Sequence, residues 1–156
     1  GSMQQPYPLE FLFTPGRVTI AIETYSVVRR IHTDGRAHPA DPDPTYQGSS
    51  IGHWEGDTLV VDTLGILTRT SPMNGIRGHG AGLRIIERLR LVEPDLLEIT
   101  TTRTDPTVFI EPYTTQAYYR RQRDWQIMEY VCAQNNRDPL DEQGNPTFQL
   151  ERQPEE

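Results

Sequence analysis

The feature that most constrains the fold of this chain is its strand-like alternation between residues 11 and 131. Short runs rich in β-branched and aromatic residues are separated there by glycine, proline and aspartate, and no stretch sustains a helical period. In residues 18–22, for example, valine and isoleucine alternate with threonine and alanine, as in a strand with one buried face. The pattern therefore predicts an all-β fold.

The runs combine into successive hairpins. The predicted strands cover residues 11–13, 18–22, 27–33, 50–54, 58–64, 84–92, 96–104, 113–121 and 125–131. Because only closure removes exposed sheet edges, we expect an antiparallel meander that closes into a lipocalin-like (calycin-like) β-barrel of about eight or nine strands. A β-sandwich is the alternative. The stretch 65–82 is too rich in glycine for a helix and is predicted to be a long loop or lid.

The 156 residues suit one domain. We expect a tag and flexible N-terminus over 1–6, the barrel over 7–139, and a surface-wrapping or frayed tail over 140–156. No basic, apolar leader opens the chain. The expected location is cytoplasmic for the chain as it stands, and secreted or periplasmic if a signal peptide was removed.

Composition excludes several functional classes. The chain has no lysine, which rules out Schiff-base catalysis and the phosphate-binding lysine of a P-loop. The single cysteine, Cys132, rules out cysteine clusters for zinc or iron–sulfur centres. A net charge of −7 works against binding to a nucleic-acid backbone, and we interpret the arginines near residues 29–30 and 120–123 as solvated strand faces.

Acidic residues within apolar runs are the candidate catalytic groups. Alternation places Glu87 on one face with Ile85, Leu89 and Leu91, so Glu87 is predicted to point inward. A buried carboxylate is difficult to ionise, and proteins use such groups as general acids or bases. The structural alternative is an ion pair with a buried arginine such as Arg103.

Glu129 and Asp62 are weaker cases, because alternation leaves both undecided between the interior and the surface. For Glu129 the opposite face is equally apolar, so the phenol of Tyr130 could be the internal group instead.

The four histidines, His32, His38, His53 and His79, show no metal-binding spacing, so no metal and no cofactor are predicted. His79 lies in a glycine-flanked loop next to the strand of Glu87 and is the fourth catalytic candidate, with an exposed loop histidine as the alternative. The predicted substrate-binding residues are Trp54, Tyr119, Trp125, Tyr130, Arg103 and His53.

Two long strings, at 50–63 and at 125–137, resemble a widespread bacterial family that has no established activity. The resemblance covers about residues 7–139, and many members are similar to secreted proteins with a longer N-terminal region. Histidines stand in the family pattern where this chain has Ser49 and Arg84, whereas His53, His79 and Glu87 are kept. If the family binds a metal through histidines, the resemblance implies that this member has lost part of the site.

Our leading hypothesis is a cofactor-independent enzyme of the lyase, isomerase or cyclase type. It would perform acid–base chemistry, such as cyclisation, isomerisation, dehydration or epoxide opening, on a mainly apolar substrate inside the barrel. The alternative is a lipocalin-like binding or carrier protein for a small hydrophobic ligand, without catalysis. A third reading is an interaction module that uses exposed edge strands. The expected partner is a small hydrophobic molecule, with a homodimer left open, and neither nucleic acid nor membrane.

Overall fold

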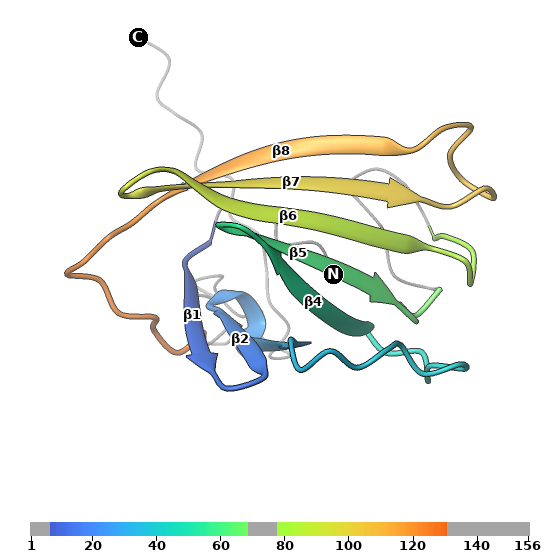
Figure 1. The fold of residues 1–156 in the computed structure, drawn as a ribbon, viewed down its shortest axis with the longest axis horizontal. Coiled ribbons are helices and arrows are strands. Elements are labelled where there is room, and N and C mark those ends of the chain that lie inside the picture. The colour runs from blue at the N-terminus through green and yellow to red at the C-terminus, as the bar shows by residue number, and fades with distance from the viewer. Residues whose placement is uncertain (1–6, 69–77, 131–156) are drawn as a thin grey trace, which may run out of the picture.

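The computed structural model describes residues 7–68 and 78–130, and it shows one eight-stranded mixed sheet curled into a half-barrel (Figure 1). The strands are β1 (Leu9–Thr14), β2 (Arg17–Ile22), β3 (Val27–His32), β4 (Ser49–Glu55), β5 (Thr58–Leu64), β6 (Arg84–Glu93), β7 (Leu96–Thr104) and β8 (Tyr113–Arg120). A short 3-10 turn, η1 (Thr24–Ser26), joins β2 to β3. The all-β prediction is confirmed.

The strands pair in chain order, and all pairs but one are antiparallel. The exception is β3 with β4, which run parallel through Ile31 opposite Ser50 and His32 opposite Ile51. The predicted antiparallel meander is therefore wrong at this point. The proline-rich connection between the two strands does not turn tightly but carries the chain back before β4 begins. Gly52 permits the close approach, since a Cβ there would lie 2.8 Å from Cγ2 of Ile31.

The described strands do not close into a barrel, because β1 and β8 are the two ends of the strand order. The predicted ninth strand is also wrong for residues 125–130, which join no ladder. Residues 121–130, the crossing segment, instead leave the end of β8 and descend past β1 (Figure 1). The backbone N–H of Met128 donates to Oε2 of Glu23 at 3.2 Å, and the Tyr130 ring lies 4.9 Å from that of Tyr25. An apolar run can lie outside a sheet as well as pair within it, since Trp125 and Met128 remain 68% and 73% exposed, and sequence alternation does not separate the two cases.

The core lies on the concave face. It consists of Val18, Ile20, Ile22, Ile31, Leu59, Val61, Leu89 and Ile99. On β6 the predicted inward face is confirmed for Ile85, Glu87 and Leu89, which are all buried. Leu91 continues that face but is 60% exposed, because it lies at the open end of the half-barrel. The predicted lid over 65–82 falls partly, and the predicted tail over 140–156 entirely, outside the described residues.

Candidate functional site

The concave face carries a buried band of polar side chains, the interior polar layer. It is formed by Arg29, Ser50, Thr63, Glu87, Thr101 and Arg103, each at most 3% exposed. The register explains the clustering, because Ser50 pairs with Thr63 on the neighbouring strand, and Glu87 pairs with Thr101. Alternation then turns these side chains to the same side as the core isoleucines and leucines.

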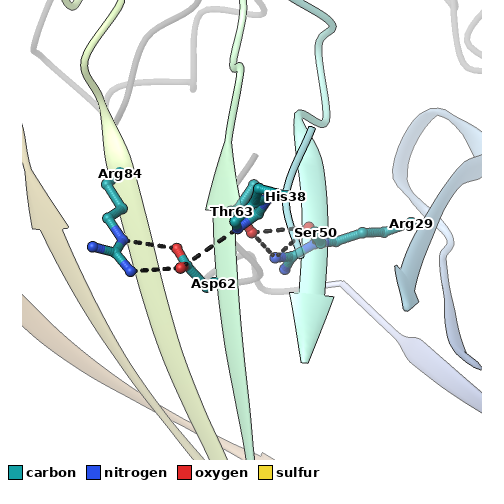
Figure 2. Close-up of polar contacts among 6 residues, drawn as sticks. All are labelled: Arg29, His38, Ser50, Asp62, Thr63 and Arg84. Atoms are coloured by element: carbon teal, nitrogen blue, oxygen red, sulfur yellow. Dashed lines mark hydrogen bonds and ion pairs between the residues drawn. The ribbon is translucent and has the colours of Figure 1, made fainter. Parts of the chain in front are cut away.

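Arg29 is the centre of this layer. Its Nη2 lies 2.5 Å from Oε2 of Glu87 and donates to Oγ1 of Thr63 at 2.8 Å. The Ser50 hydroxyl accepts from the same guanidinium at 3.3 Å and lies 2.8 Å from the Thr63 hydroxyl (Figure 2). The sequence interpretation of Arg29 as part of a solvated basic cluster is wrong. The signal that could have found it is its position two residues from both Val27 and Ile31, which places all three side chains on the same, inward face of β3.

Arg103, the arginine suggested by the sequence as a partner for Glu87, also lies in this layer. Its Nη1 donates to Oγ1 of Thr115 at 2.9 Å. Burial lowers the pKa of the Arg103 guanidinium from its ordinary value, while the nearby charge of Glu87 opposes that shift. Both arginines thus surround the Glu87 carboxylate with positive charge.

Beside the polar layer, towards the hairpin end of β6 and β7, lies a trough of about 1580 Å³. Its aromatic wall is formed by Tyr7, Phe11, Phe13, Trp54, Tyr119 and Trp125. Its aliphatic wall is formed by Leu9, Leu59, Leu89, Leu91, Leu97 and Ile127. These side chains come from both edge strands, from the strands between them and from the crossing segment, so only the curled sheet brings them together.

Several aromatic rings of the trough are open to solvent. Phe13, Trp54 and Trp125 are 63%, 52% and 68% exposed. The Phe13 ring lies 6.4 Å from that of Trp54 and also 6.4 Å from that of Phe11, which gives a continuous aromatic surface. Trp54, Tyr119 and Trp125 do line one common cavity, whereas the contributions of Phe11 and Phe13 were missed.

The trough and the carboxylate of Glu87 are separate features. Along β6, Leu89 and Leu91 line the trough, but Glu87, two residues earlier on the same face, does not. Arg103 does not line it either. The predicted catalytic and substrate-binding residues are thus divided between a buried polar band and an open apolar surface.

Asp62 lies on the opposite, convex face of β5. Its carboxylate accepts from Arg84 Nε at 2.9 Å and from Nη2 at 2.6 Å, and His38 Nε2 lies 3.4 Å from its Oδ2 (Figure 2). Hydrogen bonding to Asp62 is the first cause that raises the pKa of Arg84. The structure therefore resolves the ambiguity of Asp62 in favour of the outer face, since it pairs with the outward residue Ile86.

His79 lies at the far end of β6 from the trough. Its Nδ1 is 2.8 Å from the carbonyl oxygen of Gly80, whose N–H donates to Oδ2 of Asp105 at 2.6 Å. Asp105 also accepts from the backbone N–H and the hydroxyl of Thr107, at 2.9 and 2.7 Å. Burial is the largest influence and opposes ionisation, but these hydrogen bonds and the nearby His79 outweigh it and lower the pKa of Asp105.

The remaining predicted site residues lie away from both features. Glu129 is exposed on the crossing segment, and Tyr130 contacts Tyr25 at the β2–β3 connection. His53 is exposed on the convex face of β4, where its Nε2 lies 3.1 Å from Oε1 of Glu55. Neither Tyr130 nor His53 lines the trough.

No group of three or more histidine, cysteine, aspartate or glutamate side chains in residues 7–68 and 78–130 is arranged to hold a metal ion. Within the same ranges, no helix has the length and apolar character needed to cross a membrane. Compared with known proteins, the chain matches no protein-family model, no curated protein and no solved structure.

Proposed function

We propose that this chain is a binding domain for a small, mainly apolar molecule, which occupies the trough on the concave face. The trough itself is the observation that carries the proposal, because its walls are aromatic and aliphatic and its volume of about 1580 Å³ accommodates a drug-sized ligand. The role is that of a lipocalin-like carrier, performed here by an open half-barrel.

The exposed rings support this proposal energetically. Soluble proteins seldom leave large contiguous apolar patches in water, and such patches commonly mark binding sites. Phe13, Trp54 and Trp125 present their rings around the same cavity. Covering them would remove apolar surface from water at roughly 25 cal/mol per Å².

The binding proposal can be tested through the chain's own fluorescence. Both tryptophans of the sequence line the trough, so a neutral apolar probe such as decanol should change their emission in a saturable way. Ala117→Phe would fill the trough from the half-buried wall of β8 and should abolish the change. Val28→Phe adds the same ring on the exposed face of β3, outside the trough, and should leave binding intact.

Circular dichroism of both variants would establish that they fold. A response that does not saturate, or equal binding by Ala117→Phe and the wild type, would contradict the proposal.

Acid–base catalysis at Glu87 is the second candidate. The observation that favours it is the complete burial of this carboxylate on the concave face, where the sequence predicted a general acid or base. Its ion pair with Arg29 favours a structural role instead.

Prolonged incubation of the wild-type protein with a ligand found by the binding assay distinguishes the two functions. A carrier returns the ligand chemically unchanged by mass spectrometry. An enzyme converts it, and Glu87→Gln, if folded, would then lose the conversion while keeping the fluorescence response.

A further inference from the structure

We infer that the ligand of the trough is an amphipathic carboxylate, whose anionic group is bound by Arg121 at the rim while its apolar part lies along the concave wall. This inference rests on the proposed binding function and names the chemical class of the ligand. It follows from the position of Arg121, from the engagement of the other charges around the trough, and from the chemistry of the guanidinium group.

The pairing of β7 with β8 places the Arg121 side chain at the trough. The last pair of the ladder is Leu96 opposite Arg120, and the N–H of Arg121 then donates to the carbonyl oxygen of Asp95 at 2.9 Å. The pairing therefore continues one residue beyond β8. Alternation places Arg121 on the same side as Tyr119, and both residues line the trough.

The other arginines of the rim are engaged or turned away. Arg90 contacts Glu98 at 2.9 Å on the convex face, and Arg123 contacts Asp95 at 2.6 Å. Arg120 also borders the trough, but it lies on the face of β8 opposite to Tyr119, so its side chain leaves the sheet on the convex side. Arg121, in contrast, forms no ion pair with any carboxylate of the residues that the structure describes.

The carboxylates at the rim of the trough do not neutralise Arg121. Asp95 is paired with Arg123. Glu10 also borders the trough, but it lies on the face of β1 opposite to Leu9 and Phe11. Asp57 also lines the trough, but it does so from the β4–β5 turn and not from β8, and its Oδ1 accepts from the hydroxyl of Thr58 at 3.4 Å. The inward-facing charge at the β8 end of the trough is therefore positive.

A guanidinium at the edge of an apolar surface suits an amphipathic anion. Its planar pair of N–H donors matches a carboxylate bidentately, and such charge-assisted hydrogen bonds are stronger than neutral ones. The aliphatic stem of arginine can meanwhile cover apolar surface. A neutral apolar ligand would use the wall but not this group.

The test compares decanoate, decanol and decyltrimethylammonium as probes of equal chain length, each below its micelle-forming concentration, by tryptophan fluorescence. We expect decanoate to bind about threefold to tenfold more tightly than decanol, since Arg121 is exposed and its interaction is partly screened. Arg121→Gln should remove this preference and leave decanol affinity unchanged, and Arg121→Lys should restore part of it. Arg30→Gln removes an equally exposed arginine of β3 outside the trough and should keep the preference.

The outcomes distinguish failure of the proposed binding function from failure of the inferred ligand class. If no probe binds saturably, the binding function fails and the inference fails with it. If decanol binds as tightly as decanoate, if the ammonium probe binds best, or if Arg121→Gln keeps the preference, the trough is an apolar site but the anionic ligand class is wrong. Preference for decanoate that disappears only in Arg121→Gln and weakens with added salt establishes it.

Discussion

Arg29 of β3 and Glu87 of β6 meet across the concave face although two strands separate them in the sheet, with Nη2 and Oε2 only 2.5 Å apart. The curl of the sheet makes the contact possible, and the hydroxyls of Ser50 and Thr63, from the intervening strands, lie beside it. The two side chains are 1% and 0% exposed, so both charges have lost their hydration. The curl of the sheet therefore determines whether these two buried charges can neutralise each other.

Substituting one member of this ion pair should destabilise the protein more than substituting both members together. Glu87→Gln or Arg29→Met removes one member of this buried ion pair and should lower the free energy of unfolding by about 3–5 kcal/mol. Arg29→Met with Glu87→Met replaces both charges by apolar groups and should recover part of that loss, although the buried Arg103 loses the nearby charge of Glu87. Urea denaturation followed by circular dichroism measures all three. A double variant as unstable as the sum of the single ones would show that the charges contribute net stability.

Because of Asp105, the free energy of unfolding should decrease as the pH becomes acidic. Its pKa is lowered in the folded state, so its contribution is present above the unfolded value of about 3.9 and is lost as pH falls through the folded pKa. Asp105→Asn should cost about 1–3 kcal/mol at neutral pH, because the Gly80 and Thr107 donors lose a charged acceptor. The cost should start to shrink as pH falls below about 4 and should be smallest once pH has passed below the lowered folded pKa, where the wild-type carboxylate is itself protonated.

Melting temperatures between neutral and strongly acid pH would check this. Asp124→Asn changes an exposed aspartate and serves as the control. A penalty for Asp105→Asn that does not vary with pH would contradict the assignment.

Gly48 should be far less replaceable than Gly35, although both have positive φ, +70° and +81°. A Cβ at Gly35 meets nothing within 4 Å, so Gly35→Ala should cost only the backbone strain of about 1–2 kcal/mol. A Cβ at Gly48 would lie 2.6 Å from the carbonyl oxygen of Leu64, so Gly48→Ala must also displace β4 from β5. Chemical denaturation should rank the two variants in that order, and equal costs would show that the backbone at Gly48 adjusts freely.

The crossing segment should be held by its contacts with the β2–β3 connection. Glu23→Ala removes the acceptor of the Met128 N–H, and we expect faster amide exchange at Met128 and stronger acrylamide quenching of Trp125. Global stability should change little, because this hydrogen bond is exposed. Glu111→Ala, at an exposed glutamate outside this contact, is the control. Unchanged exchange at Met128 in Glu23→Ala would mean that other contacts hold the segment.

Sequence alternation was sufficient for most of the strands and for the inward direction of Glu87, because side chains of a strand alternate whatever its neighbours are. It was insufficient for residues 125–130, where apolar residues on both faces fit a strand equally well. It also failed to identify Arg29 as buried, since a pair of adjacent arginines has the same composition whether one of them points inward or both are solvated.

The candidate site was only partly accessible to sequence reasoning. Trp54, Tyr119 and Trp125 were expected at a cavity and do line one, but Glu87 and Arg103 were assigned to the same cavity and lie in the interior polar layer instead. Alternation gives the face on which a side chain lies, but not its distance along that face from another strand's residues. That distance depends on register, which is set by strand pairing over long separations.

The sequence by itself determined an all-β chain, the hairpins, and the inward side of Glu87, because each follows from local period and turn chemistry. Only the tertiary structure decided that β3 and β4 are parallel, that the described strands stop at a half-barrel, and that Arg29 neutralises Glu87 away from the trough. These features depend on sheet curvature and on contacts between distant strands. Such contacts arise from the packing of the whole chain, which no single segment encodes.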